Sequence, residues 1–125
     1  MSDCLFCKII AGEIPGNAVF ENDRVYAFRD INPQAPVHVL IVPKKHMDNV
    51  LQCDGETAAA LVDAARQIAA SEGVDKSGFR VVSNCGKHGA QSVNHLHIHL
   101  MGGKQLPERM GYCLLYTSPS PRDRG

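Results

Sequence analysis

The sequence lacks a long hydrophobic run, an excess charge of either sign and an even number of cysteines. No segment reaches the roughly 18 uninterrupted apolar residues that a transmembrane helix needs, so we expect no membrane partner. Basic and acidic residues number 13 each, which provides no general attraction to nucleic acid or membranes. Five cysteines without a secretory leader favour reduced thiols or metal ligands over a disulfide framework. We therefore expect a cytoplasmic protein.

The length of 125 residues suits one compact domain with a modest core. The final stretch "YTSPSPRDRG" combines Ser-Pro repeats, charge and no apolar periodicity, which is typical of an unstructured tail. Its composition fits a cloning or sequencing appendage at least as well as a natural tail. We therefore assign residues 1–111 to the domain and exclude residues 112–125 from the fold.

Apolar periodicity and turn formers divide the domain into predicted elements. A short helix covers residues 4–11, and a long alanine-rich helix begins at the N-cap Asp54 and ends at Gly73. The predicted strands cover residues 19–21, 25–29, 38–42, 79–83 and 95–101. This order predicts an α+β domain with a largely antiparallel five-stranded sheet, one short helix and one long helix.

The segment "NHLHIHL" holds half of the six histidines. Because side chains alternate along a strand, His95, His97 and His99 would share one face, and the branched apolar residues between them would face the core. At about 3.3 Å per residue, the outer two imidazoles attach roughly 13 Å apart, so all three cannot bind one ion, although an adjacent pair can. The segment therefore predicts a strand with one face in the core and the other face carrying histidines that are available for catalysis or binding.

The segment "CLFC" places Cys4 and Cys7 at the spacing of a zinc half-site. A redox pair has the same spacing but is expected in a βαβ context, which this N-terminal region lacks. A zinc site needs two further ligands. Cys53, Cys85 and Cys113 show no ligand spacing and are expected to be thiols.

The segment "HLHIHLM" resembles the signature of the histidine-triad (HIT) family, in which three histidines alternate with hydrophobic residues. Three ordered stretches resemble its nucleotide-binding Hint branch: "FCKIIAGEIP", "FRDINPQAPVHVLIVPKKH" and "GAQSVNHLHIHLMGG". The resemblance covers residues 4–111 and implies a HIT fold whose sheet extends across a homodimer. It also implies a hydrolase or nucleotidyl transferase that cleaves purine nucleoside phosphoramidates, with related adenylates and dinucleoside polyphosphates open as substrates.

The resemblance implies a role for each matching residue. His97 would attack the α-phosphorus as a neutral imidazole, and water would then hydrolyse the nucleotidyl-histidine. His99 would donate to a phosphoryl oxygen, and His38 and Ser92 complete the catalytic set. The nucleotide-binding set comprises Asp30 at the ribose hydroxyls, Asn84 near the phosphate, and the apolar walls around the base formed by Leu5, Phe6, Ile9, Phe28 and Ile31.

The resemblance also supplies the missing metal ligands. His46 and His95 would join Cys4 and Cys7 in a closed structural zinc site, and no catalytic metal is expected. Two other functions stay open: a purine-nucleotide-binding interaction module with incidental catalysis, and a metal hydrolase that uses His97 and His99 as a ligand pair. The chain departs from many Hint proteins where a tryptophan-containing end would follow, so the resemblance leaves leaving-group selectivity undetermined.

Overall fold

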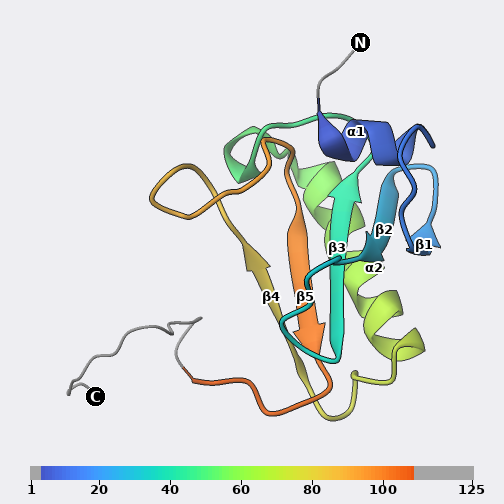
Figure 1. Ribbon diagram of the computed structural model, residues 1–125, viewed down its shortest axis with the longest axis vertical. Helices are drawn as coiled ribbons and strands as arrows, with labels where there is room; N and C mark the ends of the chain where they lie inside the picture. Colours follow the sequence, from blue (N-terminus) through green and yellow to red (C-terminus); the bar gives the residue numbers. More distant parts are fainter. Residues whose placement is uncertain (1–3, 109–125) are drawn as a thin grey trace.

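The computed structural model describes residues 4–108. They form a five-stranded antiparallel sheet with the order β1-β2-β3-β5-β4 (Figure 1). The elements are α1 (Leu5–Ile10), β1 (Ala18–Glu21), β2 (Val25–Arg29), β3 (Val37–Pro43), η1 (Val50–Gln52), α2 (Gly55–Ser71), β4 (Phe79–Ser83) and β5 (Ile98–Gly102). The predicted α+β class, antiparallel sheet and pair of α-helices are confirmed. The predicted tail, residues 112–125, lies outside the described residues.

Residues that form turns and helix caps lie at the ends of the elements, where the sequence predicts them. The side-chain oxygen of Asn22 accepts from the backbone N–H groups of Arg24 and Val25 and closes the β1–β2 hairpin. Asp54 caps α2 by accepting from the Thr57 N–H at 2.8 Å. Beyond α2, Gly73 has a φ of +76°, the left-handed conformation that ends many helices.

No helix within residues 4–108 is long and apolar enough to cross a bilayer.

The two helices pack on opposite faces of the sheet (Figure 1). One core lies between α2 and the residues Val39 and Ile41 of β3. A second core joins Phe6 and Ile9 of α1 to the other face, where Leu40 and Val42 of β3 lie among its members. Alternate residues of β3 therefore enter different cores, which explains the near-continuous apolar sequence of this strand.

The strand predicted for residues 95–101 begins later than expected, at Ile98. The β3–β5 ladder ends at the Ile41–Ile98 pair, and two residues farther along β3 Pro43 has no N–H to donate to it. The preceding segment bonds to the chain after β3 instead, and the Leu96 N–H donates to the Met47 carbonyl. The predicted alternation still holds, since Leu96 and Leu100 enter the core beneath α2.

Candidate functional site

His97 lies directly before β5 and is only 3% exposed. Its Nδ1 lies 2.8 Å from the backbone carbonyl oxygen of His95. A carbonyl oxygen can only accept, so Nδ1 carries the proton of the neutral ring and Nε2 retains its lone pair. The ring packs edge-on against Phe6, with 5.1 Å between centroids. These contacts leave Nε2 as the ring nitrogen with an available lone pair.

His99 is oriented by a chain of hydrogen bonds that starts in the loop between β2 and β3. The Gln34 N–H donates to Nδ1 of His38 at 2.9 Å, so the His38 proton is on Nε2. That Nε2–H donates to Nδ1 of His99 at 2.9 Å, which leaves His99 with a proton on its own Nε2. The His97 and His99 rings are 5.1 Å apart between centroids. His99 is therefore a hydrogen-bond donor next to the ring of His97.

Burial keeps the imidazoles of His38 and His99 uncharged. Desolvation, with smaller contributions from His97 and His38, lowers the pKa of His99 to about 4. Desolvation also lowers the pKa of His38, and the Asp30 carboxylate, 3.3 Å from His38 Nε2, partly opposes that shift. Both rings are neutral near pH 7, so the hydrogen-bond chain keeps its direction.

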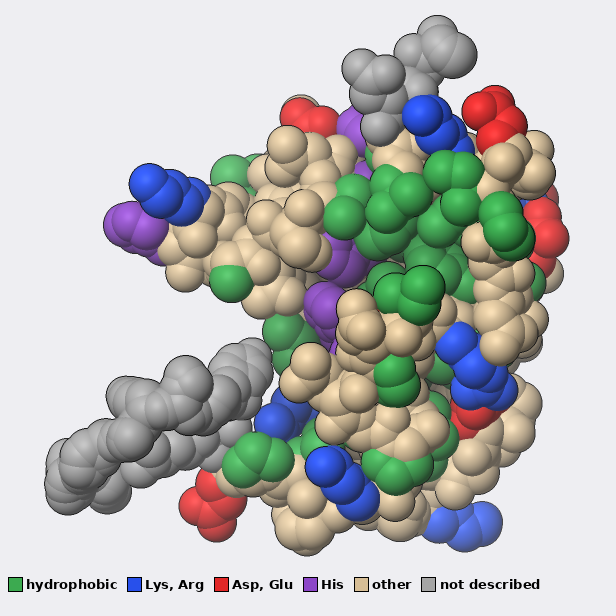
Figure 2. Space-filling view, viewed as in Figure 1, with side chains coloured by type: hydrophobic (Ala, Val, Ile, Leu, Met, Phe, Trp, Pro, Cys, Tyr) green, Lys and Arg blue, Asp and Glu red, His purple; other side chains and the backbone are tan. Residues whose placement is uncertain are grey.

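An apolar hollow of about 700 Å³ lies beside α1. All five residues predicted as walls around a base line this hollow: Leu5, Phe6, Ile9, Phe28 and Ile31. Ile31 is 90% exposed, so this residue forms the rim of the hollow. Figure 2 shows hydrophobic side chains gathered on this face, with histidines at their border.

A second, more polar hollow of about 560 Å³ is lined by four further predicted residues, His38, His99, Asn84 and Ser92, whereas the buried His97 is among the lining residues of neither hollow. Asp30 lines both hollows and therefore lies at their border. The structure thus places a carboxylate between an apolar cavity and a group of histidines. This is the order of groups that a nucleotide presents as base, ribose and phosphate.

The loop between β4 and β5 is held by contacts that the sequence analysis missed. Gln91 accepts from the Gly86 N–H and donates to the carbonyls of Val93 and Asp48. The Asn84 amide donates to the Gly89 carbonyl at 2.7 Å, so Asn84 also organises the loop. A lone glutamine in a polar loop carries no signal of this role, because its partners are backbone groups.

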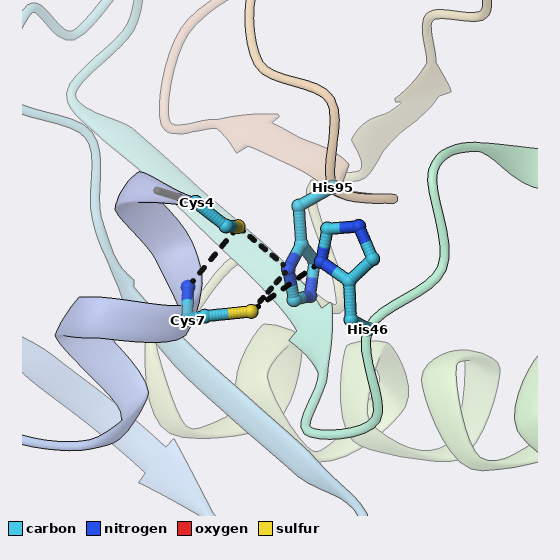
Figure 3. Close-up of side chains that lie close together, drawn as sticks. All are labelled: Cys4, Cys7, His46 and His95. Atoms are coloured by element: carbon cyan, nitrogen blue, oxygen red, sulfur yellow. Dashed lines mark hydrogen bonds between the residues drawn. The ribbon is translucent and has the colours of Figure 1, made fainter. Parts of the chain in front are cut away.

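Cys4, Cys7, His46 and His95 form a cluster in which one ligand atom of each lies within 4.8 Å of the others (Figure 3). The cysteines come from the start of α1, His46 from the loop after β3, and His95 from the segment before β5. The Cys4 sulfur is 3.2 Å from Nδ1 of His95, and the Cys7 sulfur is 3.3 Å from Nδ1 of His46. All four predicted metal ligands therefore converge.

Hydrogen bonds from Nε2 of each histidine to groups outside the cluster turn Nδ1 toward the cluster. His95 donates from Nε2 to the Pro43 carbonyl at 2.9 Å, and His46 donates from Nε2 to the Asp48 carboxylate at 3.0 Å. Both Nδ1 lone pairs consequently point at the sulfurs, which is how zinc-binding histidines are held in proteins. Two thiols and two such imidazoles form a tetrahedral zinc donor set, which favours a zinc site over the redox alternative for the cysteine pair.

A second group of converging donors among residues 4–108 consists of Asp30, His38 and His99. Both nitrogens of His38 and Nδ1 of His99 are used by the hydrogen bonds described above, in which the Gln34 N–H binds the far nitrogen of His38. His97 belongs to neither group. The alternative of a metal hydrolase with His97 and His99 as its ligand pair thus gains no support from the described residues.

Comparison with known proteins agrees with the fold and the histidine segment. The family model described as "HIT domain" matches residues 11–106. A purine nucleoside phosphoramidase of Escherichia coli is 43% identical over 107 residues, which are 83% of this chain and 90% of the relative. A 14 kDa zinc-binding protein of Brassica juncea is 44% identical over 109 residues, which are 83% of this chain and 96% of the relative.

A solved structure gives the same result for the fold. The crystal structure of a HIT family hydrolase from Legionella pneumophila superposes with a TM-score of 0.84 at 45% identity. The match covers 87% of this chain and all of that one. The sheet topology, the alternating histidines and these matches lead to one conclusion: the chain belongs to the histidine-triad (HIT) family.

Proposed function

We propose that the chain is a hydrolase that cleaves the P–N bond of purine nucleoside phosphoramidates through a covalent nucleotidyl intermediate on His97. The observation that carries the proposal is the bond from Nδ1 of His97 to the His95 carbonyl, which leaves the Nε2 lone pair beside a neutral donor, His99. The E. coli relative named purine nucleoside phosphoramidase supports the substrate class.

The two hollows support a position for each part of the substrate. The base enters the apolar hollow beside α1, and Asp30 at the border accepts from the ribose hydroxyls. The phosphate lies in the polar hollow, where His99 donates from Nε2 to a phosphoryl oxygen and Ser92 and Asn84 contact the phosphate or the departing group. The neutral donor offsets the charge that develops on that oxygen.

The reaction proceeds in two displacements. The Nε2 lone pair of His97 bonds to phosphorus, the P–N bond breaks, and the leaving amine takes up a proton from solvent. Water then attacks phosphorus, the bond to Nε2 breaks, and a nucleoside monophosphate and a proton are released. The His95 carbonyl accepts from Nδ1–H throughout and stabilises the positive charge on the ring while Nε2 is bonded to phosphorus.

We also infer that zinc binds the Cys4, Cys7, His46 and His95 cluster as a structural ion. The thiolates and imidazoles supply four donors, so the ion joins α1, the loop after β3 and the segment before β5 without an open position for a substrate. The B. juncea relative named a zinc-binding protein supports the choice of metal. In this role zinc keeps His95, and with it the carbonyl that orients His97, in place.

We infer a homodimer in which β4 pairs with its counterpart. β4 is an edge strand, and its residues Phe79 and Val81 are 37% and 46% exposed. Val81 is paired with Leu100, whose side chain faces α2, so Val81 lies on the same side of the sheet as Val62 of α2, which is 59% exposed. A second copy would cover this apolar edge.

Replacing His97 by alanine is expected to reduce the hydrolysis of adenosine 5′-phosphoramidate by at least about 1,000-fold, because the nucleophile is removed. His88→Ala, at an exposed loop position, is the matched control and should retain wild-type turnover. Release of ammonia is measured for each protein with and without EDTA. A wild-type protein that binds AMP but does not turn over would favour the nucleotide-binding module instead.

The zinc site is tested at its outer partner. Asp48→Ala removes the acceptor that orients His46 and should weaken zinc binding by about 10–100-fold. Asp75→Ala, which removes an exposed carboxylate after α2, should leave zinc binding unchanged. Affinity is measured by titration with a competing chelator. A wild-type chain that neither copurifies with zinc nor binds added zinc would contradict the assignment.

Stability should fall as the pH drops from 6.5 toward 4. The folded chain lowers the pKa values of His38 and His99, that of His99 from 6.5 to about 4, so the unfolded chain binds more protons in this window and acid favours unfolding. Urea unfolding at several pH values measures the slope. His99→Gln should flatten this slope and His88→Gln should not, whereas identical slopes in the two variants would refute the account.

The homodimer is tested by sedimentation velocity. Val81→Glu places a charge in the proposed interface and should convert dimer to monomer at low micromolar concentration. Ile31→Glu is the control, because Ile31 is also apolar and 90% exposed but lines the hollow beside α1, on the other face of the sheet. A wild-type chain that sediments as a monomer would exclude the proposed dimer.

A further inference from the structure

The polar hollow continues beyond the histidines to two basic side chains. Arg80 of β4 and Lys104, two residues after β5, line it together with His99 and Ser92. Figure 2 shows lysine and arginine side chains on the same face as the central histidines. The function proposed above uses the histidine end of this hollow and leaves the basic end without a role.

The positive charge at this end is not neutralised within residues 4–108. Arg80 and Lys104 take part in none of the ion pairs among these residues. Asp30, the carboxylate of the hollow, lies at its histidine end beside His38. An N–H of Arg80 donates to the Pro107 carbonyl, which orients the guanidinium but does not neutralise it. An anion in the hollow would therefore meet two uncompensated cations.

The strand register places Arg80 on the side of His99 that is away from His97. Val82 of β4 is paired with His99, and Arg80 is paired with Met101, so Arg80 lies two residues, about 7 Å, beyond His99 along the same face. His97 lies on the opposite side of His99 along the chain. In-line displacement moves the leaving group away from the attacking nitrogen, here past His99 toward Arg80.

We propose that Arg80 and Lys104 form a leaving-group subsite that selects phosphoramidates whose amine carries a carboxylate close to the nitrogen. The proposal rests on the phosphoramidate hydrolysis proposed above and names the substrate class within it. A guanidinium can bind a carboxylate through two N–H donors, and a nearby ammonium adds attraction. The neutral histidines hold the phosphate, and the charged pair distinguishes among leaving groups.

The test uses two substrates that differ only in this charge: the adenosine 5′-phosphoramidate of alanine with a free carboxylate, and its carboxamide. For wild-type protein, kcat/KM should be about 10–100-fold higher for the carboxylate, the size of a charge-assisted hydrogen bond. Added salt should reduce this ratio, because the hollow is open to solvent. In the double variant Arg80→Gln/Lys104→Gln, the ratio of the two kcat/KM values should fall toward one.

Two further variants separate charge recognition from structural damage. Arg80→Lys keeps a cation in the hollow and should retain most of the kcat/KM preference for the carboxylate substrate. Lys87→Gln removes an exposed loop charge outside the hollow and should leave this preference unchanged. Equal kcat/KM values for the two substrates in wild type, or an unchanged ratio in the double variant, would overturn the subsite alone. If wild type hydrolyses neither substrate, the proposed function fails as well.

Discussion

The end of the β3–β5 ladder at the Ile41–Ile98 pair, two residues before Pro43, is the constraint on which both sites depend. Pro43 has no N–H to extend this ladder, and the chain before β5 leaves the sheet and bonds to the segment after β3. The His95 ring then donates to the Pro43 carbonyl, and the His95 carbonyl accepts from the ring of His97. One short irregular segment thus presents His95, a proposed metal ligand, and His97, the proposed nucleophile, two residues apart.

The imidazoles of both sites have their protons placed by fixed partners. The Pro43 carbonyl and the Asp48 carboxylate turn two lone pairs toward the cysteines. The Gln34 N–H, acting through His38, gives His99 its donor nitrogen. These histidines therefore differ in which ring nitrogen carries the proton, because their hydrogen-bond partners differ.

Local signals in the sequence predicted much of the fold. Asn22, Asp54 and Gly73 act within a few residues of their position in the chain, so their turn, cap and stop could be predicted. The alternation of the histidine segment predicted its core face correctly and its first strand residue wrongly. Where the ladder ends depends on β3 and Pro43, and Pro43 lies 52 residues from His95 in the sequence.

The site was predicted as a set of residues, and the resemblance to a known family contributed most of that set. Gln91 and Asp48 were missed since their roles depend on backbone groups and rings brought close only by folding. The uncompensated charge of Arg80 and Lys104 was also invisible in the sequence, which balances acidic and basic residues overall. Charge within a cavity follows from three-dimensional placement, and composition does not report it.

Mass spectrometry of wild-type protein mixed with adenosine 5′-phosphoramidate and quenched in alkali during turnover tests the central claim most directly. Alkaline conditions preserve a phosphorus–imidazole bond, so the intermediate can be located in a peptide digest. The account predicts a nucleoside monophosphate attached to the ring of His97. Turnover at the wild-type rate with no adduct on His97, or with the adduct on another residue, would contradict it.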